Sequence, residues 1–127
     1  MAELTKLKDK ADRLFSKYIR LKYSQDGYVT CYTCPTTRAI EHQQCGHFIK
    51  RAHLNTRWDE ENCRVQCRAC NEFLDGNYKV FLRRLKKEIG HLAFEALERR
   101  KNTLKIMKKA DYELLIEDLK LKLKKYE

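Results

Sequence analysis

The sequence contains a single proline among 127 residues and has no long apolar run. A membrane-spanning helix needs about 20 consecutive apolar residues, and no stretch approaches that length, so we expect no membrane-spanning helix. The N-terminal residues 1–6 lack the basic and then apolar order of a secretory signal. Since little proline interrupts helices and 36% of the residues are charged, we expect a soluble, helix-rich, cytoplasmic protein.

The formal net charge is +10, and the excess lies at the two ends of the chain. Residues 1–22 hold seven basic against three acidic side chains, residues 99–127 hold ten against five, and residues 23–98 hold eleven against ten. Each phosphate that a basic group neutralises releases bound counterions, so nucleic acid is the partner that this charge favours. The alternative is a solvated basic surface that only keeps the protein soluble.

Six cysteines are present, and metal binding explains them better than disulfides do, because cytosolic thiols stay reduced. Four of them form two Cys-x2-Cys pairs, Cys31/Cys34 and Cys67/Cys70, with 32 residues between the pairs. Two such turns complete a tetrahedral shell of four thiolates, which predicts a structural Zn²⁺ that contributes to folding. A redox role would require a surrounding βαβ pattern, which the sequence lacks.

Two cysteines, Cys45 and Cys63, are left over. We expect both to be small buried apolar side chains, the commonest role of a free cysteine. A metal role stays open for Cys45, which lies two residues from His47. The histidines at 42 and 91 have no context that assigns them a role.

Hydrophobic periodicity predicts helices at both ends of the chain and short strands between them. Heptad-like apolar seams mark the first and last helices, and each seam needs a partner helix. The two seams either pack on each other within one chain or join two chains in a homodimer. Helices are predicted over 4–22, over 78–89 with a stop at Gly90, over 91–101, and in a last segment capped by Asp111. Strands are predicted over 28–30, 45–50 and 63–67. Turns are predicted at 26–27 and 75–77, and a loop over 51–62.

A longer pattern surrounds the second cysteine pair. His47 and Phe48 lie in the string GHFI, Asn62 follows, and Asn71 comes directly after Cys70. This arrangement resembles the HNH or ββα-metal nucleases, and an Asn at that place is similar to the endonuclease VII branch, which cuts DNA junctions. The resemblance implies that His47 is the general base, that Asn62 holds the loop that orients it, and that Asn71 helps to bind a catalytic Mg²⁺ or Mn²⁺.

A closer resemblance covers nearly all 127 residues. The strings GHFIKRAH (46–53), TRWDEEN (56–62) and QCRACN (66–71), with the first cysteine pair, are similar to the NinG-type phage recombination proteins. That family implies endonuclease activity on branched DNA in a bacterial or phage-infected cell.

The sequence departs from the nuclease motif at one place. The motif has Asp or His, a metal ligand, directly before the catalytic His, whereas this chain has Gly46. The metal must find another ligand, and the candidates are His53, Asp59 and Asp75. Asp75 lies one helical turn beyond Asn71 if that segment is helical.

Basic side chains at two places are candidates for DNA contact. Arg51 and Arg57 flank the proposed site, where they either hold the scissile phosphate or are solvated loop residues. In the tail the candidates are Lys120, Lys122, Lys124 and Lys125.

The expected fold class is α+β in a single domain over 1–127. A ββα-metal (HNH-like) core on a four-cysteine zinc site (26–77) follows an N-terminal helix (1–25) and precedes a basic helical part (78–127). The expected function is a divalent-metal-dependent DNA endonuclease that acts on branched recombination intermediates. The alternative, which Gly46 keeps open, is a non-catalytic zinc-stabilised module that binds nucleic acid as a recombination accessory or regulator.

Overall fold

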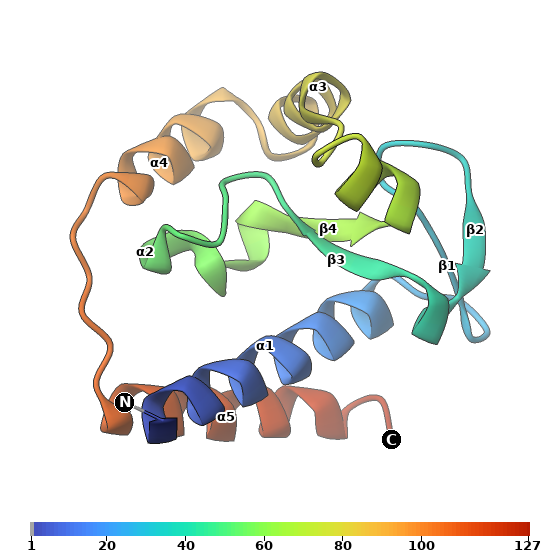
Figure 1. The fold of residues 1–127 in the computed structure, drawn as a ribbon. Coiled ribbons are helices and arrows are strands. Elements are labelled where there is room, and N and C mark those ends of the chain that lie inside the picture. The colour runs from blue at the N-terminus through green and yellow to red at the C-terminus, as the bar shows by residue number, and fades with distance from the viewer. Residues whose placement is uncertain (1) are drawn as a thin grey trace.

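Strands of three or four residues form the centre of the structure, and helices cover them on both sides (Figure 1). The computed structural model describes residues 2–127. β1 (Tyr28–Thr30) pairs antiparallel with β2 (Thr37–Ala39), and β3 (Gln44–His47) pairs antiparallel with β4 (Cys63–Gln66). The fold class is α+β, as predicted, with helices flanking a small two-sheet region.

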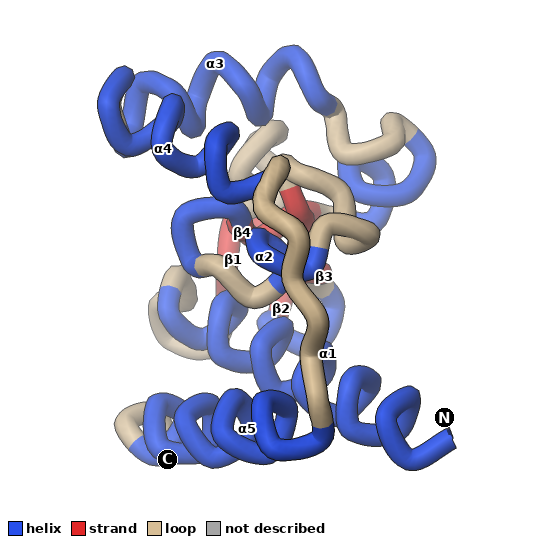
Figure 2. Tube along the Cα trace, turned by 90° about the vertical axis from the view of Figure 1, so that its left-hand side faces the viewer, coloured by secondary structure: helices blue, strands red, loops and turns tan. Residues whose placement is uncertain are grey.

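The long helices lie in two groups on opposite sides of the strands. α1 (Ala2–Lys22) and α5 (Lys109–Lys124) lie side by side below the strands in Figure 1, whereas α3 (Tyr78–Ile89) and α4 (His91–Lys101) lie above them. Residues 102–108 connect α4 to α5 as an extended loop, which crosses the front of Figure 2. The short helical elements are η1 (Ile40–His42), α2 (Leu54–Arg57), η2 (Glu60–Asn62) and the π-helical η3 (Ala69–Phe73).

Each helix group buries its own apolar cluster. One cluster joins α1, the strands and α5, and the other joins the β3–α2 loop to α3 and α4. Burying one such side chain contributes about 1.5–3 kcal/mol, so each cluster stabilises the position of its helices on the strands. The first contains Phe15, Ile19, Val29, Cys63, Val65 and Leu119, and the second contains Phe48, Ile49, Phe81, Leu85, Phe94 and Leu97.

The two terminal seams pack on each other within the chain. Leu14 and Tyr18 of α1 pack on the cluster that contains Leu119 of α5, and the ring of Tyr18 lies 6.2 Å from that of Tyr126. The adjacent line of α1, which includes Phe15 and Ile19, is buried in the same cluster together with residues of the strands. The seams therefore have an intramolecular partner, and they no longer supply a reason to expect a homodimer.

Glu60 fastens the terminal helices to the centre of the fold. Its carboxylate accepts hydrogen bonds from Tyr18 Oη (3.0 Å) and Lys22 Nζ (2.9 Å) of α1 and from Lys122 Nζ (3.1 Å) of α5. Lys22 and Lys122 hold the pKa of Glu60 below its usual value, although burial opposes that shift. This contact fixes α1 and α5 relative to β4, which follows η2 directly.

Several local expectations differ from the structure. The strand predicted over 45–50 ends at His47, and β2 was not predicted, since its Thr-Arg-Ala sequence has no apolar alternation. The predicted loop 51–62 is wrong in part, because it contains α2 and η2. The last helix begins at Lys109, and the Asp111 carboxylate accepts the Lys108 backbone N–H at 2.8 Å. Within residues 2–127 no helix has the length and apolar character needed to cross a membrane.

Candidate active site and metal centre

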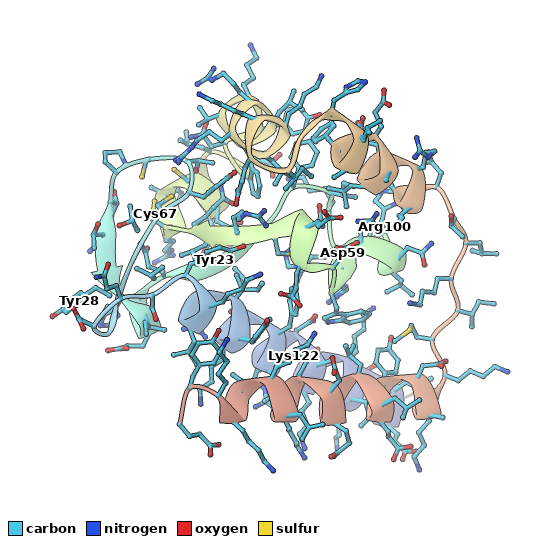
Figure 3. The ribbon with its side chains drawn as sticks, turned by 180° about the vertical axis from the view of Figure 1, so that it is seen from behind. Tyr23, Tyr28, Asp59, Cys67, Arg100 and Lys122 are labelled. Carbon is cyan, nitrogen blue, oxygen red and sulfur yellow. The ribbon has the colours of Figure 1, made fainter. Side chains whose placement is uncertain are left out.

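The structure brings the four cysteines of the two Cys-x2-Cys pairs together. Cys31 and Cys34 come from the segment after β1, Cys67 directly follows β4, and Cys70 lies in η3. Their four sulfur atoms lie within 4.8 Å of one another. Cys34 Sγ lies 3.6 Å from Cys67 Sγ. The cluster, seen at Cys67 in Figure 3, could hold a structural metal such as zinc, since four sulfur donors are the shell that Zn²⁺ prefers.

The thiols of this cluster differ in acidity, because burial raises the pKa values of Cys67 and Cys70 although both sulfur atoms have nearby N–H groups. The backbone N–H of Cys70 donates to Cys67 Sγ at 3.4 Å, and Asn77 Nδ2 lies 3.7 Å from Cys70 Sγ. Burial opposes ionisation of Cys34, but hydrogen bonds with Thr36 outweigh it and lower the pKa of Cys34 to about 6. Cys34 therefore loses its proton more readily than Cys67 or Cys70.

A cleft of about 470 Å³ lies between α1 and the β3 strand. Both walls come from segments that the sequence separates widely, because α1 crosses the β3–β4 sheet (Figure 1). The cleft contains the predicted base His47, the predicted metal ligand Asn71 and one predicted phosphate ligand, Arg51. Its lining consists of Asp12, Phe15, Ser16, Gln44, Cys45, His47, Lys50, Arg51, Asn71, Glu72 and Gly76.

A backbone carbonyl orients the imidazole of His47. Nε2 lies 2.8 Å from the carbonyl oxygen of Arg57, so Nε2 carries the proton and donates it to that oxygen. The lone pair is then on Nδ1. Burial lowers the pKa of His47 below its ordinary value, with a further contribution from the positive charge of Arg51, which together outweigh the hydrogen bond to Arg57. The ring is therefore neutral at pH 7 and able to accept a proton.

Asn62 ties the end of β3 to α2. Its side chain is fully buried, its Oδ1 accepts the Ile49 N–H at 2.7 Å, and its Nδ2 donates to the carbonyls of Ile49 (3.0 Å) and Thr56 (2.9 Å). Thr56 directly precedes Arg57, whose carbonyl holds the imidazole. The side chain of Asn62 thus fixes the loop that orients His47, in the geometry that a positioning role requires.

The structure explains the glycine before His47. A Cβ atom at Gly46 would lie 2.0 Å from Oε1 of Gln66, which is fully buried. Gln66 is held in place because its Nε2 donates to Thr33 Oγ1 (3.0 Å) and to the Gly76 carbonyl (2.9 Å). An acid at position 46 would require this packing to change, so no metal ligand fits there.

Asn71 lies in the cleft at the start of η3, directly after the metal centre. Its Nδ2 donates to Gln44 Oε1 at 2.7 Å, and Gln44 Nε2 in turn donates to Glu72 Oε2 at 2.5 Å. This chain of three side chains leaves Asn71 Oδ1 for another partner, whereas Glu72 Oε1 forms an exposed ion pair with Arg68 Nε at 3.5 Å. These oxygens form the polar end of the cleft.

The three further candidates for metal binding do not line this cleft. Asp75 is 91% exposed and pairs with Lys50 at 2.9 Å, since η3 ends at Phe73 and Asp75 has a φ of +48°. It borders a small separate hollow that also touches His47. His53 is exposed before α2 and faces residues 101–105. Asp59 pairs with Arg100 at 2.8 Å, as Figure 3 shows.

The basic candidates for DNA contact differ in their exposure and in their ion pairs. Arg51 is exposed at the rim of the cleft, 3.7 Å from Asp12. Arg57 is buried, and both its Nε (3.0 Å) and Nη2 (2.5 Å) donate to the Asp12 carboxylate. In α5, Lys120 pairs with Glu117 and Lys122 with Glu60 and Asp118. Lys124 and Lys125 form no ion pair within residues 2–127 and are exposed.

Three cleft residues were missed by the sequence analysis. Asp12 accepts hydrogen bonds from Arg57 and, at 2.9 Å, from Trp58 Nε1, but it precedes these partners by about 45 residues in a helix without a motif. Gln44 also lies outside any motif. Glu72 directly follows Asn71, and this adjacency was a signal that could have identified it.

Comparison of the sequence with known protein families identifies one family. The model of the Bacteriophage Lambda NinG protein family matches residues 1–127. The chain belongs to the NinG family. No curated protein and no solved structure matches this NinG-family chain. The family is associated with phage recombination, and the cysteine cluster of this member could hold a metal.

Proposed function

We propose that this NinG-family protein is a divalent-metal-dependent endonuclease of the HNH-like type that cuts branched DNA. The observation that carries the proposal is an oriented, neutral His47 in the same cleft as Asn71. The β3–β4 hairpin followed by η3 has the element order of a ββα-metal core, and the four-cysteine cluster, filled by Zn²⁺, would hold the hairpin against η3.

In the proposed reaction His47 acts as the general base. Its Nδ1 takes a proton from water, the water oxygen bonds to phosphorus, and the bond to the 3′ oxygen breaks. Asn62 acts indirectly, because it fixes the segment whose carbonyl orients the ring. Arg51, exposed at the rim, is placed to contact the phosphate, whereas Arg57 serves to hold Asp12.

The cleft offers oxygen donors for Mg²⁺ or Mn²⁺, which take carboxylate and amide oxygens. Asn71 and Glu72 would hold the ion, and Glu72 supplies the negative charge that Gly46 cannot. When bound, the ion stabilises the extra charge on the phosphate and on the leaving oxygen.

A second basic region supports nucleic acid as the substrate. A hollow of about 730 Å³ on the face seen in Figure 3 has Tyr23, Arg64, Arg83 and Lys87 in its lining. The Arg64 guanidinium lies 5.5 Å from the ring centroid of Tyr23, and Arg83 and Lys87 form no ion pair within residues 2–127. Arg64 itself is buried and pairs with Glu88 at 3.1 Å, so Arg83 and Lys87 are the groups available to phosphates, and the exposed aromatic Tyr23 is available to bases.

The test is cleavage of labelled four-way junctions, flaps and linear duplexes with Mg²⁺, with Mn²⁺ and with EDTA. Branched DNA should be cut in the presence of either ion, and His47→Ala should keep its fold and DNA binding but lose roughly 10²–10⁴-fold in rate. If the wild type binds junctions and cuts none of these substrates, the alternative of a non-catalytic binding module is correct, an outcome that Gly46 makes worth testing.

A further inference from the structure

Two cysteines outside the four-cysteine cluster lie next to His47. In the β3–β4 sheet His47 is paired with Cys63, and Cys45 is on the same face of β3 as His47, two residues earlier. The two sulfur atoms and a ring nitrogen of His47 all lie within 4.8 Å of one another. This trio shares no residue with the four-cysteine cluster.

Two thiols and an imidazole are the donors that a thiophilic cation such as Zn²⁺ prefers. The His47 ring is already oriented as a metal-binding histidine is, with one N–H donated to a backbone carbonyl, here that of Arg57 at 2.8 Å. That hydrogen bond leaves the Nδ1 lone pair as the donor atom. Cys63 Sγ lies 3.9 Å from the same carbonyl oxygen, so one backbone group locates two of the three donors.

The trio is accessible from one side only. Cys63 is fully buried, whereas Cys45 and His47 line the cleft beside α1. A cation held by the three donors would be enclosed by protein on the Cys63 side and would face the cleft with its fourth coordination position. Three protein donors and one open position distinguish reactive zinc sites from structural ones, which are closed by four.

The alternative role for Cys45 and Cys63 is apolar packing. Both do pack with the cluster that contains Phe15 and Val65. Packing alone does not require two sulfur atoms to lie next to an imidazole. Here the antiparallel pairing of β3 with β4 places both sulfur atoms next to His47. Metal binding and packing also predict different results when the thiol is replaced by a side chain of similar size.

We propose that Cys45, His47 and Cys63 form a second metal site, which binds Zn²⁺ or a similarly thiophilic divalent cation at the cleft. Binding releases the thiol protons and uses the lone pair of one ring nitrogen of His47. If His47 is the general base of the proposed nuclease, a cation in this site prevents it from accepting a proton, so Zn²⁺ inhibits cleavage while Mg²⁺ supports it. This regulatory consequence rests on the proposed function, whereas the metal site itself does not.

The test counts metal ions and does not depend on cleavage. The full chain is reconstituted with Co²⁺ under a non-thiol reductant, and bound metal is measured by elemental analysis and by the Co²⁺ absorption bands. Wild type should bind a second equivalent, whose spectrum shows fewer sulfur donors than the first. Cys45→Ser and His47→Gln should each lose that second equivalent and keep the first, and His53→Ala, which removes an exposed histidine elsewhere, should keep both.

A wild-type protein that binds a single equivalent in excess Co²⁺ would overturn the metal site, and so would a second equivalent that survives in both Cys45→Ser and His47→Gln. Circular dichroism shows whether each variant is folded. If Cys45→Ser does not fold, the number of metal ions bound by His47→Gln tests the second site. The two proposals fail separately. Absence of DNA cleavage in Mg²⁺ would remove the nuclease and leave the second equivalent standing, whereas loss of the second equivalent would leave Mg²⁺-dependent cleavage intact.

Discussion

Replacing Asn62 with alanine should both destabilise the protein and disturb His47. The substitution removes the three hydrogen bonds of a fully buried side chain. The Ile49 N–H and the carbonyls of Ile49 and Thr56 then lose their bonds to the Asn62 amide. At about 1 kcal/mol net for each bond, the free energy of unfolding should fall by about 3 kcal/mol. For a chain of this length that corresponds to a melting temperature lower by roughly 10–15 °C.

The same change releases the segment whose carbonyl holds the imidazole. Cleavage by folded Asn62→Ala should therefore decrease more than DNA binding does, because the defect lies in the orientation of the base. Stability is measured by urea unfolding followed by circular dichroism, with the metal centre kept saturated. The matched control is Asn102→Ala, since Asn102 is exposed at the end of α4 and its side chain forms no hydrogen bond within residues 2–127.

A free energy of unfolding for Asn62→Ala within about 0.5 kcal/mol of wild type would refute the reasoning, because surface substitutions change stability by that much. Equal losses in Asn62→Ala and Asn102→Ala would refute it as well.

Three further predictions address the metal centre, the base and the DNA contacts. Cys70→Ser should release the structural metal and unfold the centre of the chain, so elemental analysis that finds zinc retained in a folded variant would contradict the four-cysteine site. Because burial lowers the pKa of His47, its neutral form persists in more acidic solution. The cleavage rate should therefore rise with pH to a plateau, with a midpoint below about 6.5. A midpoint above that value would exclude His47 as the buried base. By the same shift the unfolded chain binds the proton more tightly than the folded one, so the free energy of unfolding should decrease as the pH falls below about 6.5. Neutralising Lys120, Lys122, Lys124 and Lys125 together should weaken DNA binding and flatten its salt dependence by roughly 0.9 in log–log slope per lost phosphate contact. Most of that effect should come from Lys124 and Lys125, which are free of ion pairs within the described chain. The double variant Arg83→Gln with Lys87→Gln tests the basic hollow beside α3 in the same way. If the slope of either variant equals that of wild type, the residues changed in it do not contact DNA.

The features that the sequence could predict are those encoded by residues close together in the chain. The Cys-x2-Cys spacing predicts a metal turn from four residues, and both turns form one cluster. The heptad seams predicted the first and last helices, and Gly90, with a φ of +88°, separates α3 from α4 as expected. Asn62 and His47 came from the family resemblance; the structure connects them through the Thr56–Arg57 segment, and their roles in cleavage stay predictions.

The features that escaped prediction depend on tertiary contacts. Asp12 reaches the cleft because α1 packs across the β3–β4 sheet, and no local pattern in a helix reports such a contact. Asp75 was placed near Asn71 by helical spacing, but the segment leaves the helical conformation at Leu74. The seams are equally compatible with a partner in the same chain or in another, and only the packing of α1 on α5 distinguishes them.

The packing of α1 on α5 also has a consequence for synthesis on the ribosome. α1 emerges first, yet its helical partner follows about 100 residues later, and contacts of such separation form late because the entropy of closing the loop must be paid before they stabilise anything. Until then the apolar seam of α1 is uncovered, although Asp12 already has its partners Arg57 and Trp58. A nascent chain of this protein should therefore have its four-cysteine centre and its cleft, whose lining ends at Gly76, before α5 covers the seam of α1.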